Sequence, residues 1–242
     1  GSLVSKNNYL YDFTSQFGNK DKPQEVVDLI NTWKEHLPDY EIKEWNESNF
    51  DISLYDYARE AYECKKFAFV SDVCRLYALQ EGGIYLDTDV EVLKSFDEFL
   101  NLESFVGMES SDTYSTAIIG ASPNTCWIKT FLDEYKHIHF KKGNKMDVMP
   151  NTARLRVLMS HLPQSLKPKI YAQDYFSAKN YKTGKINRTN NTVSIHHFNA
   201  SWVSTPKVVR LEEKLWNFLH LPNFNIANKI VWNLKLNKFI SW

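Results

Sequence analysis

The chain has 242 residues, and its 29 Lys and Arg residues balance 29 Asp and Glu residues, so the formal net charge is zero. Hydrophobic residues at 43% and charged residues at 24% are typical of a globular domain and exclude a disordered chain. The charge balance also argues against a dedicated nucleic-acid-binding protein, which needs a surplus of Lys and Arg. Any strongly charged site must therefore be local.

Two helices and a strand are predicted in the first third of the chain. Apolar residues recur at helical spacing from Pro23, which suits a first helical turn, to Pro38, which stops the run. Residues 40–45 then alternate as a short strand. A second helix is predicted over 66–80, and the pair of glycines that follows it is a familiar helix stop.

Short apolar segments behind this second helix predict buried strands, and one more helix follows them. These elements are strands at 84–86, 105–108 and 117–120 and a helix at 125–139. Strands that alternate with helices imply an α/β fold with a parallel or mixed sheet. In such sheets ligands bind beyond the carboxyl ends of the strands, which is where Asp87-Thr-Asp89 falls.

Asp87 and Asp89 are the strongest chemical signal in the sequence. Residues two apart in a strand face the same side, so both carboxylates are expected to converge at the strand's end. Two adjacent carboxylates repel unless a proton or a cation lies between them, and such oxygen ligands suit Mg²⁺ or Mn²⁺. From this short motif alone, a solvated loop end or a helix N-cap is an equal alternative.

Two further pairs of residues can carry chemistry. Asp72 and Arg75 lie three apart on the second predicted helix and share a face, where they can hold sugar or phosphate oxygens. The pattern alone favours a simple intrahelical ion pair. His196 and His197 follow a predicted strand at 192–195, and an imidazole there can complete a metal site. The plain alternative is a pair of half-buried histidines at a strand end.

The run 67–92 reads FAFVSDVCRLYALQEGGIYLDTDVEV. It closely resembles the sugar-binding, DXD-containing region of family 32 glycosyltransferases, which include bacterial capsular and O-antigen transferases. Segments 105–109, 115–121 and 195–202 follow in the order of that family, so the resemblance covers roughly residues 17–205.

The resemblance implies a GT-A fold, a Rossmann-like mixed sheet flanked by helices, in one catalytic domain over 1–205 with a helical appendage at 206–242. It implies a metal-dependent, anomer-retaining transfer of a hexose or N-acetylhexosamine from a nucleotide sugar, with a UDP-sugar favoured. The acceptor would be a glycan or a lipid-linked glycan, as in bacterial polysaccharide biosynthesis.

The resemblance also implies roles for individual residues. Asp89 would ligate Mn²⁺ or Mg²⁺ together with Asp87, which would also contact sugar or ribose. Asp72 and Arg75 would hold donor hydroxyls in the catalytic centre, with Arg75 also near the diphosphate. The remaining implied residues are His197, in preference to His196, as a metal ligand, Ser201 and Trp202 at the diphosphate, and Ala117 in the sugar pocket.

One departure from the family pattern keeps other functions in view. The first strand of the family usually carries a His and a Trp that cradle the nucleotide base, and residues 9–18 contain neither. A catalytically degenerate protein that binds sugar nucleotide or glycan is therefore one alternative. A haloacid-dehalogenase-like phosphatase, which also places D-x-D after an apolar strand, is another.

Residues 207–242 and the first residues of the sequence predict where in the cell the protein is located. Residues 207–242 mix Lys and Arg with many aromatic residues, which suits a membrane interface as well as a helix packed on the core. The start lacks the basic and apolar regions of a signal peptide. We therefore expect a cytoplasmic protein with peripheral contact to the inner face of the membrane.

Overall fold

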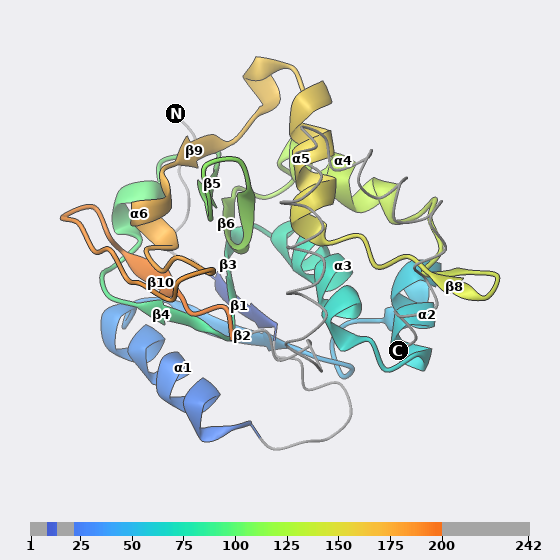
Figure 1. The fold of residues 1–242 in the computed structure, drawn as a ribbon, viewed down its shortest axis with the longest axis horizontal. Helices are drawn as coiled ribbons and strands as arrows, with labels where there is room; N and C mark the ends of the chain where they lie inside the picture. Colours follow the sequence, from blue (N-terminus) through green and yellow to red (C-terminus); the bar gives the residue numbers. More distant parts are fainter. Residues whose placement is uncertain (1–8, 14–21, 200–242) are drawn as a thin grey trace. The chain divides into compact units, whose positions relative to one another are not determined.

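A six-stranded mixed sheet organises the fold. The computed structural model describes residues 9–13 and 22–199. The strand order is β2-β1-β3-β6-β5-β9, and these strands are β1 (Tyr9–Phe13), β2 (Glu41–Trp45), β3 (Gly83–Asp87), β5 (Ser104–Met108), β6 (Tyr114–Ala121) and β9 (Lys169–Tyr171) (Figure 1). Within this sheet β6 alone is antiparallel to its neighbours, β3 and β5. The other five strands thus end at one common edge.

Helices cover the sheet, as expected for a GT-A arrangement. They are α1 (Gln24–His36), α2 (Asp56–Glu63), α3 (Phe67–Leu79), α4 (Cys126–Glu134), α5 (Asn151–His161) and α6 (Gln173–Phe176), with short 3₁₀ turns η1 (Ile52–Leu54), η2 (Asp97–Phe99) and η3 (Gln164–Leu166). Figure 1 shows α1 beside the small sheet of β4 (Val90–Val92) and β10 (Ser194–His196), away from α2 to α5. A hairpin of β7 (Lys141–Lys142) and β8 (Lys145–Met146) completes the described elements. The predicted α/β class is confirmed.

Alternate residues of β3 face two separate apolar clusters. Tyr85 belongs to the cluster made with α2, α3, α4 and α5, whereas Ile84 and Leu86 belong to the cluster made with α1, β4 and η2. All three side chains are at most 2% exposed. Because successive strand residues point to opposite faces, an apolar run of this kind is the pattern of a strand covered on both sides.

Helix α1 fixes the small sheet that follows β3. Trp33 is fully buried, and its indole N–H donates a hydrogen bond to the carbonyl of Val90 at 2.7 Å. The hydroxyl of Thr32 accepts a hydrogen bond from the backbone N–H of Val92 at 3.0 Å. These bonds hold β4, and with it the turn that contains Asp89.

Most of the helices and strands predicted within the described residues are present, and one helix is shorter than expected. The helix predicted over 125–139 is α4, which ends at Glu134. The chain then turns so that Phe140 packs in the core, 5.4 Å from the ring of Tyr57 and 5.1 Å from that of Phe69. Helices α2 and α5 were not predicted. The predicted appendage at 206–242 lies outside the described residues.

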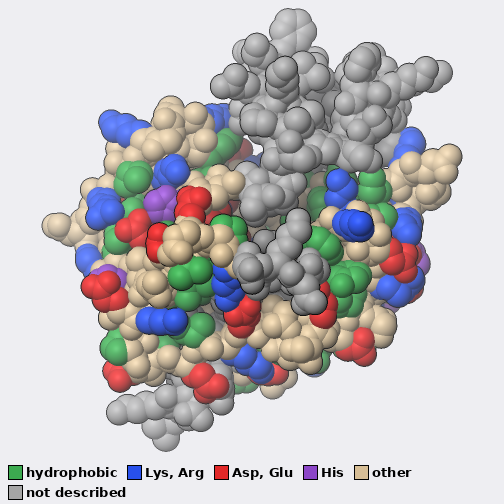
Figure 2. Space-filling view, turned by 90° about the horizontal axis from the view of Figure 1, so that it is seen from below, with side chains coloured by type: hydrophobic (Ala, Val, Ile, Leu, Met, Phe, Trp, Pro, Cys, Tyr) green, Lys and Arg blue, Asp and Glu red, His purple; other side chains and the backbone are tan. Residues whose placement is uncertain are grey.

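The surface described carries charges of both signs. Figure 2 shows acidic and basic side chains interspersed on the visible face, in keeping with the zero net charge. Across the described part of the chain, no helix combines the length and apolarity that a bilayer crossing requires.

The turn between α3 and β3 depends on Gly82. Its φ is +81°, and a Cβ atom built there would lie 2.6 Å from Cδ of Pro123 and 2.7 Å from the Pro123 backbone nitrogen. Gly82 therefore needs both a left-handed backbone and an absent side chain. Gly184 has a φ of +71° but nothing within 4 Å of such a Cβ.

Replacement of these two glycines by alanine separates the two constraints. Gly184→Ala is expected to lower the free energy of unfolding by about 1 kcal/mol, because only the left-handed backbone is strained. Gly82→Ala is expected to cost about 1–3 kcal/mol more, because Pro123 must also move. Urea denaturation of both variants measures the difference, and equal losses would contradict this account of the turn.

Candidate functional site

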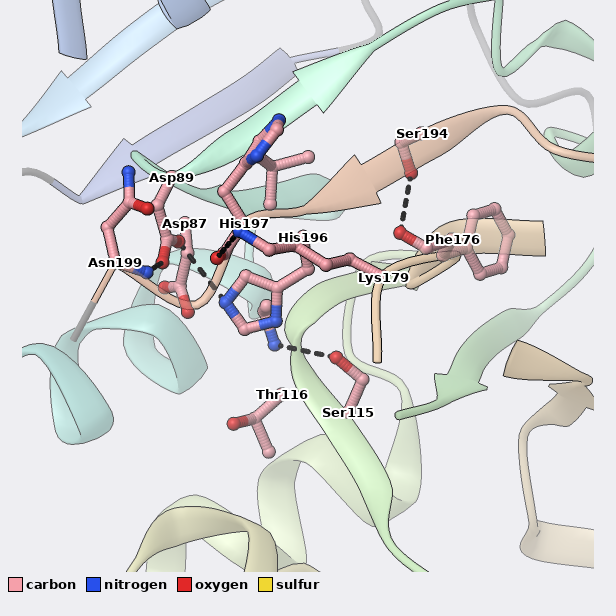
Figure 3. Close-up of polar contacts among 12 residues, drawn as sticks. Asp87, Asp89, Ser115, Thr116, Phe176, Lys179, Ser194, His196, His197 and Asn199 are labelled. Carbon is pink, nitrogen blue, oxygen red and sulfur yellow. Dashed lines mark hydrogen bonds and ion pairs between the residues drawn. The ribbon is translucent and has the colours of Figure 1, made fainter. Parts of the chain in front are cut away.

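Two carboxylates and an imidazole converge at the carboxyl edge of the sheet. Asp87 ends β3, and Asp89 lies in the turn that leads into β4. Strand β10 pairs antiparallel with β4 so that His196 stands opposite Val90. One ligand atom from each of Asp87, Asp89 and His196 lies within 4.8 Å of the others (Figure 3). We call these three residues the Asp-Asp-His cluster.

His196 and Asp89 form an ion pair inside this cluster. Nε2 of His196 lies 3.2 Å from Oδ1 of Asp89, and His196 is 9% exposed. Burial opposes both charges, yet the imidazole and the N–H of Asn199 lower the pKa of Asp89 below its ordinary value. Burial opposes the charge of His196, but Asp89, with contributions from Asp87 and Glu109, raises the pKa of the imidazole. The raised pKa favours a protonated imidazole, whose positive charge lies beside the carboxylates where a cation could also bind.

Arg75 approaches Asp87 from the other side. Arg75 is only 6% exposed, and its Nη1 lies 3.4 Å from Oδ1 of Asp87 and donates to the carbonyl of Thr116 at 2.6 Å. Its Nη2 lies 3.1 Å from Oδ1 of Asp72. The hydroxyl of Tyr85 donates a short hydrogen bond, 2.5 Å, to the same Asp87 oxygen. The intrahelical pair of Asp72 and Arg75 thus exists, but it is buried and joined to the cluster.

The pKa values of Asp72 and Arg75 are both affected by burial, but neighbouring charges change the outcome differently for each. Burial raises the pKa of Asp72 to about 6, although Arg75 and the amide of Asn151 oppose that rise. Burial also acts against the charge of Arg75, but Asp87, Tyr85 and Asp72 outweigh it, so its pKa is raised above the ordinary value. Buried groups with strongly perturbed pKa values gather at functional sites more often than elsewhere.

His197 does not lie beside the aspartates. Its Nε2 contacts Oε2 of Glu91 at 2.8 Å, and its backbone N–H donates to the carbonyl of Asp89 at 2.9 Å. Neighbouring residues at a strand end point to opposite sides, so only one of two consecutive histidines can face the carboxylates. The structure places His196, and not the expected His197, next to Asp87 and Asp89, and ligation of a metal by either imidazole stays a prediction.

Three predicted site residues remain, and only one of them lies in the described part of the chain. Ala117 lies on β6, where the β3–β6 register sets it next to the end of β3, and it is 2% exposed. Ser201 and Trp202 lie outside the described residues. Their roles at the sugar and the diphosphate stay predictions.

Sequence reasoning missed Glu109, which follows the carboxyl end of β5. Burial raises the pKa of Glu109 to about 7, and Asp87 and Asp89 add to that rise, while His196 and Arg75 oppose it. Its carboxyl group is therefore within electrostatic reach of the whole site. The signal that could have found it is the rule already applied to the aspartates, an ionisable residue directly after an apolar strand.

Asn151 was missed as well. It is 4% exposed at the start of α5, and its Nδ2 donates to the backbone carbonyl of Asp72 at 3.3 Å. No hydrogen-bond partner of its Oδ1 occurs in the described structure. Nothing in the sequence around α5 pairs it with α3.

The Asp-Asp-His cluster fits a divalent cation. Two carboxylates and one imidazole within 4.8 Å of one another form a donor set that suits Mn²⁺, and carboxylates suit Mg²⁺ as well. Such an ion would replace the proton on His196 and relieve the repulsion between the two aspartates. The adjacent guanidinium of Arg75 adds a fixed positive charge. The site can thus bind an anionic ligand through a cation on one side and Arg75 on the other.

Comparison with known proteins agrees with the resemblance read from the sequence. Residues 23–106 match the family described as "Glycosyltransferase sugar-binding region containing DXD motif". This segment includes Asp72, Arg75, Asp87 and Asp89. This segment of the chain is therefore similar to a sugar-binding region of the kind that the family name assigns to glycosyltransferases.

A curated relative matches part of the chain. Glucan organizing enzyme 1 of Cryptococcus neoformans var. grubii serotype A (strain H99) is 39% identical over 83 residues. The match covers 30% of this chain and 23% of that protein, so the chain matches less than a quarter of the relative's length. This relative is fungal, and the expected bacterial origin of the present chain stays a prediction.

Solved glycosyltransferase structures are similar at low identity. The apo form of GlyE from Streptococcus pneumoniae TIGR4 has a TM-score of 0.48 at 12% identity, over 94% of this chain and 63% of that one. A glycosyltransferase involved in glycosylation of the major capsid of PBCV-1 has a TM-score of 0.45 at 10% identity, over 86% and 98%. PaToxG glycosyltransferase has a TM-score of 0.41 at 19% identity, over 52% and 59%.

Mn²⁺ binding is expected to depend on pH through His196. The raised pKa keeps a proton on this imidazole to higher pH, and the ion must displace that proton. Mn²⁺ affinity should therefore increase as pH rises from 5.5 to 8, which electron paramagnetic resonance titration of free Mn²⁺ measures. His196→Gln should bind Mn²⁺ about 10–100-fold more weakly at pH 8 and lose much of the pH dependence.

His197→Gln is the matched control, because it removes the neighbouring imidazole while leaving the cluster in place. It should keep the affinity and pH profile of the unmodified protein. Weaker binding in His197→Gln with normal binding in His196→Gln would reverse the assignment.

Proposed function

We propose that this protein is a metal-dependent, anomer-retaining glycosyltransferase. It moves a hexose or N-acetylhexosamine from a nucleotide sugar, with a UDP-sugar favoured, to a glycan or a lipid-linked glycan. One observation carries the proposal: the Asp-Asp-His cluster and the buried Arg75 meet at the carboxyl edge of the sheet, within and beside the matched sugar-binding region.

The Asp-Asp-His cluster, Arg75 and Asp72 would each bind a different part of the donor or its cation. Asp89 and His196 would hold Mn²⁺ or Mg²⁺, with Asp87 completing the set, and the ion would offset charge on the leaving diphosphate. Arg75 would add a second positive charge that needs no rearrangement, because Asp72 and Thr116 already hold its guanidinium. The carboxylate of Asp72 would accept a hydrogen bond from a hydroxyl of the donor sugar.

The acceptor, the stereochemistry and the location rest on the family resemblance and on composition. We place the protein in the cytoplasm, with the basic and aromatic segment 207–242 suited to the inner face of a membrane that carries a lipid-linked acceptor. Polysaccharide biosynthesis is the process in which such a transfer would take part.

Replacement of Asp89 tests the proposed reaction. The unmodified protein should hydrolyse at least one of UDP-glucose, UDP-galactose, UDP-N-acetylglucosamine, UDP-N-acetylgalactosamine and GDP-mannose when Mn²⁺ is present. Asp89→Asn keeps the shape of the side chain but loses its charge, so this activity should fall by about a hundredfold or more. Released nucleoside diphosphate gives the rate, and circular dichroism shows whether the variant is folded.

Asp133→Asn is the control, because Asp133 is 49% exposed on α4 and forms a surface ion pair with Lys136, away from the Asp-Asp-His cluster. It should retain full activity. A metal-independent, active Asp89→Asn enzyme would contradict the assignment. Release of phosphate from p-nitrophenyl phosphate, without use of any sugar nucleotide, would instead support the phosphatase alternative.

A further inference from the structure

Glu109 lies on the same edge of the sheet as the Asp-Asp-His cluster. Strands β3 and β5 both run antiparallel to β6, which lies between them, so they point in the same direction. Asp87 ends β3, and Glu109 follows the last residue of β5. Neighbouring strands are about 4.8 Å apart, so the two strand ends are separated by about 10 Å. The backbone N–H of Glu109 donates to the carbonyl of Thr113 at 2.9 Å and fixes the β5–β6 turn.

The carboxyl group of Glu109 is partly buried and has no partner within the described structure. Neither a hydrogen bond nor an ion pair to it is formed by the described residues. Its surroundings are unfavourable to a second negative charge, since Asp87 and Asp89 both repel it. The oxygens of Glu109 are not among the fully buried side-chain atoms that lack a partner, so a ligand bound beside the site can donate a hydrogen bond to them.

Two of the proposed ligands, the cation and the diphosphate, are unsuitable binding partners for the carboxyl group of Glu109. The cation is one, because the group of ligand atoms within 4.8 Å comprises Asp87, Asp89 and His196 and does not include Glu109. The diphosphate is the other, because a carboxylate and a phosphate repel one another. The part of a nucleotide sugar or glycan that suits a carboxylate is a hydroxyl group, which donates the hydrogen bond that the oxygens accept.

We propose that Glu109 binds a hydroxyl of a hexose held beyond the carboxyl ends of β3 and β5, and that it is a sugar-binding residue of this site. This inference rests on the proposed glycosyltransferase function. The hexose is either that of the donor or that of the acceptor, since both present the same hydroxyl chemistry. Arg75, whose Nε is buried and unpartnered among the described residues, lies on the cluster side of the same space.

Glu109→Gln tests the proposal, because the amide keeps the shape but replaces one acceptor oxygen with a donor group. UDP contains no sugar ring beyond its ribose, so Mn²⁺-dependent UDP binding, measured by calorimetry, should stay within twofold of the unmodified protein. If the donor hexose is bound, hydrolysis of the preferred sugar nucleotide should fall about 10–100-fold. If the acceptor hexose is bound, hydrolysis should persist, and transfer to glucose, galactose, mannose and N-acetylglucosamine should fall by a similar factor.

Glu103→Gln is the matched control, since Glu103 is exposed and directly precedes the opposite end of β5. It should leave all three measurements unchanged. Glu109→Ser serves as the second variant where Glu109→Gln does not fold, as judged by circular dichroism.

Two results would overturn the inference. One is unchanged hydrolysis and transfer in folded Glu109→Gln, and the other is loss of UDP binding itself, which would place Glu109 at the cation or nucleotide. Failure of the proposed function is distinguishable from both, because the unmodified protein would then neither bind UDP nor use any sugar nucleotide.

Discussion

The buried guanidinium of Arg75 is the constraint on which the rest of the site depends. A charge that is 6% exposed must be compensated inside the protein, because an unpaired buried ion costs several kcal/mol. Its compensation comes from Asp72 on α3, Asp87 on β3 and the carbonyl of Thr116 on β6. These three interactions of Arg75 therefore connect α3 to β3 and β6, and they hold Asp87 at the edge of the sheet.

Asp87 and Asp89 are paired with different positively charged side chains, and these two partners differ in whether they can lose a proton. Arg75 accompanies Asp87 and cannot lose its proton, whereas His196 accompanies Asp89 and can. A divalent cation can therefore take the place of the proton on His196 without removing the buried pair of Arg75 and Asp87. Glu109 forms no such ion pair among the described residues and follows the end of β5 on the same edge of the sheet. Although the chain has zero net charge, the positive and negative charges at this site are strongly separated.

Local patterns in the sequence predicted the elements that position the site. Helices α1 and α3 follow from apolar spacing, and the turn at Gly82 follows from the glycine pair, so the Asp pair could be placed at the sheet edge. What could not be predicted depends on pairing between distant strands. The choice of His196 over His197 follows from the register in which His196 stands opposite Val90.

The same reason accounts for the residues that were missed. The position of Glu109 directly after an apolar strand is visible in the sequence, but its place on the same edge as Asp87 depends on β3 and β5 both running antiparallel to β6. Asn151 meets Asp72 across 79 positions of sequence. The role of Arg75 was uncertain from its helix alone, because an intrahelical pair with Asp72 looks the same in sequence whether it is exposed or buried.

The central claim is that Asp89 and His196, with Asp87, form the cation site beside Arg75. Anomalous diffraction from crystals grown with Mn²⁺ and UDP tests it most directly. The account predicts one strong Mn²⁺ peak within coordination distance of a carboxylate oxygen of Asp89 and Nε2 of His196. A peak between Glu91 and His197 instead, or UDP bound at the site with no Mn²⁺ at the Asp-Asp-His cluster, would contradict it.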